Sequence, residues 1–222
     1  MDADLLPLQE KGKNPAEHMS PYPDMALIRC YAGLNMRAFI AIKLPENILS
    51  SINNIQEDLK QYRFPVRWVR PGHIHLTLKF FGDISESDIK SIEIAMDACA
   101  GICPPVTLSA KGIGVFPSLA RPRVMWAGLS GQVSMLSTLQ DALEKNLEKY
   151  GFIKEERPFK GHLTIGRFKD KVNSEQLIEA MRKHKDFNTD VFVAAEIILF
   201  KSDLLPAGPV HTELLKVPLT AS

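Results

Sequence analysis

Cysteine, net charge and long apolar runs are all scarce in this chain, and each shortage excludes a class of protein. The 222 residues include three cysteines, Cys30, Cys99 and Cys103, an odd and sparse set that excludes a disulfide framework and favours a reducing, cytoplasmic location. Because Cys99 and Cys103 have no further ligands near them in the sequence, we expect buried thiols, no metal and no other cofactor. No apolar run approaches the roughly 20 residues of a membrane span, so no membrane partner is expected.

The charge balance restricts how the chain can meet a nucleic acid. Its formal net charge is +1, from 27 basic and 26 acidic residues, and 45% of its residues are hydrophobic. This composition is that of an ordinary soluble globular protein and not of a basic nucleic-acid coat. Any nucleic acid is therefore expected at a local site, as a short piece or as a chain end.

The first 35 residues differ in character from the rest. They hold four prolines and no sustained periodicity, so residues 1–35 are predicted to form a flexible N-terminal extension. An apolar strand begins abruptly at Met36, and we place one domain over residues 36–222. Within it, the apolar spacing predicts helices over 45–62, 85–99, 136–150 and onward from Asn173, and strands over 36–42, 66–70, 73–81, 106–116, 123–127 and onward from Val191.

A four-residue motif occurs twice in this domain. His75-Leu76-Thr77-Leu78 returns as His162-Leu163-Thr164-Ile165. Each histidine has a proline four residues before it, a phenylalanine six residues after it and an aspartate eight residues after it. Apolar residues of the helix over 45–62 recur 88 positions later. Chance does not explain so many matches in register, so we infer an internal duplication over about residues 37–116 and 123–201.

The duplication predicts the fold class. Two copies of a strand, helix, strand, helix, strand unit favour an α+β protein of two pseudo-symmetric lobes, each an antiparallel or mixed sheet with outer helices. Equivalent strands then face each other across an active-site cleft that contains His75 and His162. We expect the chain to act as a monomer.

The motif itself indicates a chemistry. Alternation along a strand puts His75 and Thr77 on one face and the intervening leucines on the other, and His162 and Thr164 do the same. Two histidines on either side of a substrate can give and take a proton in one step, while the threonine hydroxyls donate to phosphate oxygens. In-line displacement at phosphorus needs this combination.

Three basic residues are candidates for binding an anion. Strict alternation turns Lys79 toward the face of His75, and Arg123 lies near the junction of the two lobes. Arg167 follows Thr164 by three residues, so alternation turns it away, and strand twist or a bulge would be needed to bring it round.

These motifs resemble those of the 2H phosphoesterase superfamily, whose mark is two His-x-Thr-x motifs in duplicated lobes. Within it, the matching family is that of the bacterial and archaeal RNA 2′,3′-cyclic phosphodiesterases, historically called 2′-5′ RNA ligases. The similar runs, in the family's order, are MRAFIAIKLPE, WVRPGHIHLTLKFFGD, GVFPSLARPRVMWAGL and RPFKGHLTIGRF, and the resemblance covers about residues 36–216.

The resemblance implies metal-independent opening of a terminal 2′,3′-cyclic phosphate, on RNA or on a small cyclic nucleotide, to a 2′-phosphate. Carried over, His75 and His162 are the catalytic pair, Thr77 and Thr164 the phosphate donors, and Arg167 an anion contact. We assign His75 as the acid for the leaving 3′ oxygen and His162 as the base for water. The same site could run 2′-5′ ligation, because acid and base exchange roles when a reaction reverses.

Two other interpretations remain open. His73 shares a face with His75, and two histidines at this spacing could chelate zinc in a metal-dependent phosphodiesterase. A non-catalytic RNA-binding or nucleotide-binding protein could also keep the cleft without turnover. His184 and His211 are placed at a helix end and in a C-terminal loop, where solvation is the expected state.

Overall fold

The computed structural model describes residues 35–206 and 208–220. The predicted extension over residues 1–35 lies, except for Asn35, outside the described residues, so its flexibility stays a prediction. The first strand begins at Met36, where the sequence pattern places it. Helices separate most of the strands up to Lys183, and three consecutive strands then complete the chain to Pro218.

The four predicted helices are present, and their ends follow the expected start signals. Pro45 precedes the first helix, the Asp88 carboxylate accepts from the Ser85 backbone N–H at 2.8 Å, and Asn173 accepts from the Gln176 N–H. The helices of the described residues are α2 (Glu46–Lys60), α3 (Glu86–Ala100), α4 (Val133–Glu148) and α5 (Ser174–Lys183).

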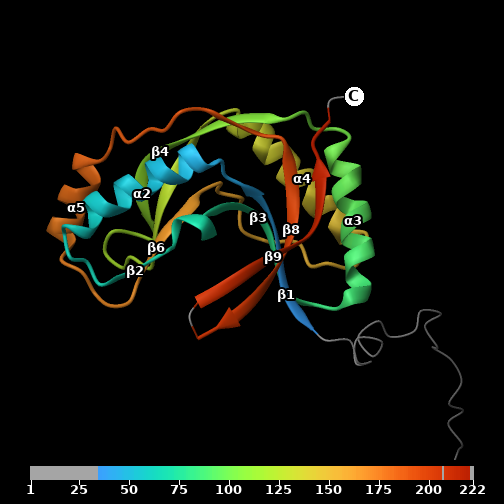
Figure 1. The fold of residues 1–222 in the computed structure, drawn as a ribbon, viewed down its shortest axis with the longest axis horizontal. Coiled ribbons are helices and arrows are strands. Elements are labelled where there is room, and N and C mark those ends of the chain that lie inside the picture. Colours follow the sequence, from blue (N-terminus) through green and yellow to red (C-terminus); the bar gives the residue numbers. More distant parts are fainter. Residues whose placement is uncertain (1–34, 207, 221–222) are drawn as a thin grey trace, which may run out of the picture. The chain divides into compact units, whose positions relative to one another are not determined.

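The strands of the described residues form one antiparallel sheet of nine strands in the order β7-β4-β5-β6-β3-β1-β8-β9, with β2 paired to β6. Their bounds are β1 (Met36–Lys43), β2 (Val66–Trp68), β3 (His75–Ile84), β4 (Val106–Phe116), β5 (Val124–Gly131), β6 (Leu163–Phe168), β7 (Phe192–Ala194), β8 (Glu196–Leu205) and β9 (Gly208–Pro218). Figure 1 shows the helices along the outer side of this curved sheet, with α2 and α5 over one half and α3 and α4 over the other.

The duplication is visible in the sheet. The bounds of β1 and β5 differ by 88 residues at both ends, and the equivalent strands β3 and β6 meet at the centre through the pair Leu76 and Leu163. The predicted α+β fold with two pseudo-symmetric halves is therefore confirmed. The structure adds that the halves exchange strands, because β4 of the first half pairs with β5 and β8 of the second half pairs with β1.

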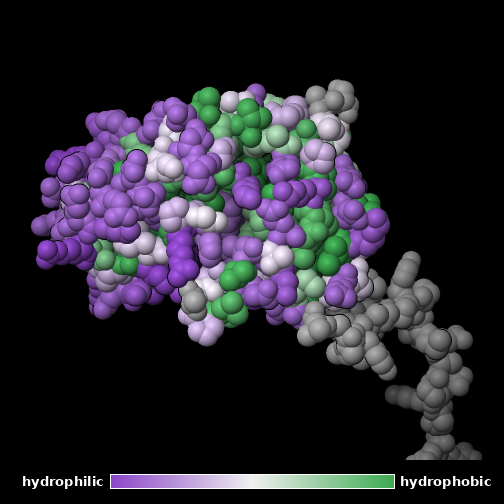
Figure 2. All heavy atoms as spheres, in the orientation of Figure 1, coloured by the Kyte–Doolittle hydropathy of each residue, from purple (hydrophilic) through white to green (hydrophobic). Residues whose placement is uncertain are grey.

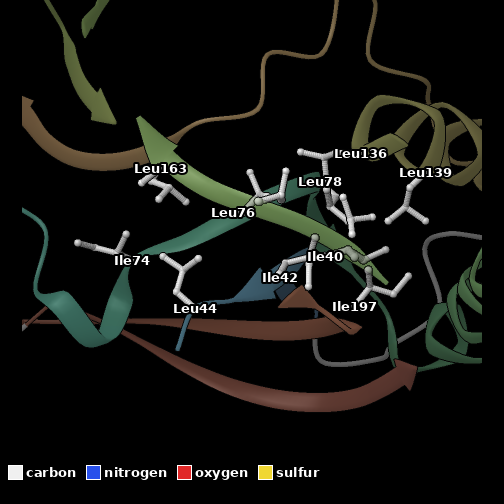
Figure 3. Close-up of a cluster of buried hydrophobic side chains, with 14 of the residues drawn as sticks. Ile40, Ile42, Leu44, Ile74, Leu76, Leu78, Leu136, Leu139, Leu163 and Ile197 are labelled. Atoms are coloured by element: carbon white, nitrogen blue, oxygen red, sulfur yellow. The ribbon is translucent and has the colours of Figure 1, made fainter. Parts of the chain in front are cut away.

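The core lies between the sheet and the helices. Leu76 and Leu163 are both 0% exposed and pack with residues of β1 and α4, as the close-up in Figure 3 shows. Truncation of a leucine at such a position to alanine typically costs about 2–5 kcal/mol. Because the leucines face this core, the residues that alternate with them face the opposite side of the sheet.

Candidate active site

The central strand pair gathers both His-x-Thr motifs. Leu76 of β3 is paired with Leu163 of β6 in antiparallel register. That register puts His75 opposite Thr164, and Thr77 opposite His162, on the face away from the core. Directly opposite residues have Cβ atoms about 4.5–5.5 Å apart, and diagonal neighbours are about 7–8 Å apart. The two histidines thus occupy one diagonal of a small square and the two threonines the other.

A β-bulge follows the motif in each half. Thr77 and Lys79 pair with consecutive residues of β1, which leaves Leu78 as an extra residue. Thr164 and Gly166 pair with consecutive residues of β5, which leaves Ile165 extra in the same way. A bulge reverses the alternation beyond it, so the fifth residue after each histidine turns to the face of the motif. These residues are Phe80 and Arg167, and both line the same cavity.

The expected orientation of Lys79 is wrong for this reason. The bulge turns its side chain toward α4, where it is 6% exposed and donates at 2.7 Å to Glu144 Oε2 and at 2.7 Å to the carbonyl of Ile153. Glu144 is 3% exposed, so this is a buried ion pair. Breaking such a pair by removing one partner is strongly destabilising, and Lys79 is therefore fixed in the interior.

A cavity of about 530 Å³ lies over the motifs. His75, Thr77, Thr164 and Arg167 line it. His162 is not among the lining residues, and the register of β3 and β6 puts it opposite Thr77, which is. Arg123 immediately precedes β5, is exposed and is not among the lining residues. The further lining residues are Phe39, Arg67, Trp68, Val69, Arg70, His73, Phe80, Ser202, Gly208, Pro209 and His211. The lining contains three arginines and no aspartate or glutamate, so it favours an anion.

His75 is held as a neutral ring at neutral pH. Burial lowers its pKa to about 4, with additional repulsion from His211 and a smaller effect of His73, against a hydrogen bond to the His73 backbone that raises it. The ring stacks on Phe39 of β1, with 4.6 Å between centroids. Packing on a nearly buried aromatic ring fixes the orientation of His75 and removes water from one side of it.

His211 is a cavity residue that the sequence reasoning missed. It lies in β9, not in a C-terminal loop, and its ring stands edge-on to His75 with 5.5 Å between centroids. Burial lowers its pKa, and the charge of His73 lowers it further. Its Nδ1 is buried and has no hydrogen-bond partner among the residues that the structure describes. No local signal marks this residue, because only the pairing of β8 with β9 brings it to the cavity.

His162 has a defined ring orientation. Its Nδ1 lies 2.7 Å from the carbonyl of Lys160, and since a carbonyl oxygen only accepts, Nδ1 donates. The ring packs edge-on against Phe116, with 5.1 Å between centroids. Nε2 is then the ring nitrogen that could accept or donate a proton at the site.

Two searches of the described residues concern metals and membranes. Residues 35–206 and 208–220 contain no group of three or more His, Cys, Asp or Glu side chains that could hold a metal ion, so His73 and His75 have no third ligand of these types within that part of the chain. None of the helices in the same part has the length and apolar character needed to cross a membrane.

Comparison with known proteins agrees with the site. The chain matches the family model described as LigT-like phosphoesterase over residues 42–126 and 130–211, one segment for each half of the duplication. It is 35% identical over 182 residues to the RNA 2′,3′-cyclic phosphodiesterase of Methanothermobacter thermautotrophicus, covering 82% of this chain and 97% of that protein. A protein of the same name from Methanocaldococcus jannaschii is 35% identical over 181 residues, with coverages of 82% and 99%. The crystal structure of the protein TT0787 of Thermus thermophilus matches with a TM-score of 0.69 at 26% identity, covering 83% of this chain and 98% of that one.

Proposed function

The chain belongs to the LigT-like phosphoesterase family, and we propose that it hydrolyses 2′,3′-cyclic phosphate ends of RNA, or of small nucleotides, to 2′-phosphomonoesters without a metal ion. The observation that carries this proposal is the pairing of Leu76 with Leu163. It sets two histidines and two threonines around one point at the edge of a cationic cavity. The names of the relatives support the choice of a cyclic phosphate as substrate.

The diagonal arrangement suits in-line attack at phosphorus. A phosphorus atom at the centre of the square lies between His75 and His162, which approach the apical positions, while Thr77 and Thr164 donate to the equatorial oxygens. One histidine takes a proton from water as the water oxygen bonds to phosphorus. The other gives a proton to the 3′ oxygen as its bond to phosphorus breaks. The product is a 2′-phosphomonoester with a free 3′ hydroxyl.

The surroundings of the rings favour the reverse of the order assigned from the sequence. A base must be neutral before it reacts, and burial holds the pKa of His75 at about 4. His75 is therefore proposed as the base for water and His162, through Nε2, as the acid for the leaving oxygen. Arg167, at the end of the cavity next to His75, attracts the anionic substrate. With the 5′ hydroxyl of another RNA end in place of water, the same steps would form a 2′-5′ phosphodiester as the bond from phosphorus to the 3′ oxygen breaks, as in 2′-5′ ligation.

The experiment is hydrolysis of an adenosine 2′,3′-cyclic phosphate with EDTA present, with chromatographic identification of the phosphate isomer released. The unmodified protein should give the 2′-phosphate, and His75→Ala or His162→Ala should each lower the rate by about 10²–10⁴-fold. His184→Ala, at the end of α5 and outside the cavity, is the matched control and should keep the full rate.

Each alternative has its own result. Loss of all activity with EDTA, and its return with zinc, would indicate a metal-dependent phosphodiesterase that uses His73 and His75. Binding of the cyclic nucleotide without turnover under any condition would indicate a non-catalytic nucleotide-binding protein. Equal rates for the two alanine variants and the unmodified protein would refute the two-histidine mechanism.

A further inference from the structure

Two arginines stand directly opposite each other on neighbouring strands. Arg67 of β2 is paired in register with Arg167 of β6, and both side chains are exposed and line the cavity. Like charges that face each other across two strands destabilise a sheet. This pair is therefore an unfavourable feature of the empty cavity, and it becomes favourable when an anion lies between or beside the two guanidinium groups.

The described part of the chain supplies no such anion at this place. Neither Arg67 nor Arg167 forms an ion pair within residues 35–206 and 208–220, and the cavity lining contains no carboxylate. By contrast, the buried Lys79 has Glu144 as its partner. Figure 2 shows mainly hydrophilic residues over the side of the molecule that contains β2, β6 and α5. An anion from outside can therefore reach the pair.

The arginine pair lies one step away from the proposed reaction centre. Arg167 follows Thr164 by three residues on the same strand and the same face, which corresponds to roughly 7–10 Å along a β-strand. That separation is comparable with one nucleotide step in an extended strand. At the other end of the cavity, beyond Thr77, the equivalent position is occupied by the uncharged Phe80. The Arg37 guanidinium lies 5.5 Å from the centre of the Phe80 ring, but Arg37 does not line the cavity, so the lining presents paired arginines at one end only.

We propose that Arg67, together with Arg167, binds the phosphate on the 5′ side of the terminal nucleoside while the cyclic phosphate occupies the histidine and threonine centre. This inference rests on the proposed function and deepens it. The preferred substrate is then a chain end that carries a 5′ phosphate, and a cyclic nucleoside phosphate without this group is a poorer one. Arg67 is a residue that determines specificity, and it makes no contact with the reacting phosphorus.

The test compares three substrates: adenosine 2′,3′-cyclic phosphate, the same molecule with a 5′ phosphate, and a diadenosine ending in the cyclic phosphate. For the unmodified protein, kcat/KM should be about tenfold higher for each of the two substrates with a 5′ phosphoryl group. The preference should fall to near one in Arg67→Ala and remain in part in Arg67→Lys. Arg182→Ala, which removes one exposed arginine of α5, is the control and should keep the full preference.

Salt provides an independent readout. For the diadenosine, log(kcat/KM) should fall as log[salt] rises. Arg67→Ala removes one phosphate contact, so the magnitude of this negative slope should be smaller by about 0.7. Thermal unfolding of the substrate-free variant checks the fold, and its Tm should be no lower than that of the unmodified protein, because one member of a like-charged pair is gone.

The outcomes separate this inference from the proposed function. If none of the three substrates is opened, the proposed function fails. If all three are opened equally well by the unmodified protein, or if Arg67→Ala lowers all three rates by the same factor, the second phosphate site is refuted while the hydrolase remains. A preference for the diadenosine alone, absent with the 5′-phosphorylated mononucleotide, would also refute it, because recognition would then depend on the second nucleoside.

Discussion

The pH dependence of cyclic phosphate hydrolysis, measured in the unmodified protein and in His162→Ala, distinguishes the two roles that His75 could take. Burial, followed by the nearby His211, holds the pKa of His75 at about 4, below its ordinary value of 6.5. A base with a pKa of about 4 is ~90% neutral at pH 5, whereas a base with the ordinary value would be ~3% neutral. At pH 5 the two cases differ by about 30-fold in kcat/KM relative to the plateau.

The assay is the initial rate with adenosine 2′,3′-cyclic phosphate at low concentration, so that kcat/KM reports the free enzyme. We expect the rate to stay near its plateau down to about pH 5 and to fall below that value. His211→Asn removes a positive charge next to His75, so it should raise the pKa of His75 and move the acid limb to higher pH. His184→Asn is the matched control, since His184 lies at the end of α5 and not in the cavity.

One result would refute the assignment of His75 as the base. If His75 gave its proton to the leaving oxygen, the reactive form would be the protonated ring, and at pH 7 only about one molecule in a thousand would carry it. In His162→Ala, where His75 is the remaining member of the catalytic pair, the residual kcat/KM would then fall steadily as the pH rises above about 4, whereas a base at this position would leave it level. An acid limb near pH 6.5 that does not move in His211→Asn would instead show that burial does not perturb His75.

Three further predictions concern stability. Between pH 6.5 and about 4 the unfolded chain binds a proton at His75 that the folded chain does not. The free energy of unfolding, measured in urea, should therefore fall on acidification, by about 3 kcal/mol from this residue. His75→Phe should remove this contribution to the pH dependence of stability. Glu144→Gln leaves Lys79 buried with an uncompensated charge and should cost about 3–5 kcal/mol, which calorimetry would register as a Tm lower by roughly 6–20 °C, whereas replacing both residues by apolar ones should cost less. Gly166→Ala puts a Cβ 2.5 Å from Val66 Cγ1, so it should push β2 from β6 and lower the free energy of unfolding by about 1–3 kcal/mol; an unchanged urea midpoint would contradict this.

Much of the fold and the centre of the site follow from local signals in the sequence. The helices have caps and apolar faces that can be recognised within a few residues, and the repeated motif predicts two equivalent strands. Alternation within each motif correctly turns His75 and Thr77 away from the core, because the leucines between them are fully buried.

The alternation of side chains between the two faces of the strand fails after each His-x-Thr motif, because helix side chains stabilise the β-bulges in β3 and β6. The amide of Gln56 in α2 donates to the carbonyl of the extra residue Ile165 at 2.7 Å, and that of Gln140 in α4 reaches the carbonyl of Leu78 at 3.5 Å. Both contacts join residues more than 60 positions apart in the chain. The same cause thus turns Lys79 into the interior and Arg167 into the cavity, and neither outcome can be derived from the strand alone.

The remaining site residues come from segments outside the repeated motif. Arg67 reaches the cavity because β2 adds to β6, and His211 reaches it because β9 pairs with β8, which in turn pairs with β1 of the other half. Pairings of this kind depend on the whole sheet, so a residue's own neighbours in the sequence give no indication of them.

These outer segments provide the asymmetry that catalysis requires. The His-x-Thr motifs are equivalent, and two identical histidines in identical surroundings would have the same pKa, so at any pH only a minority of molecules would hold one ring neutral and the other protonated in the required order. The exchange of strands gives the two rings different neighbours: His75 is enclosed by Phe39 and His211, whereas His162 has Phe116 and the carbonyl of Lys160. The same asymmetry places Arg167 at one end of the cavity and Phe80 at the other. A substrate with a second anion therefore meets paired arginines of the cavity lining at one end only. In the proposed mechanism this fixes its orientation, so that each histidine faces the same oxygen of the reaction.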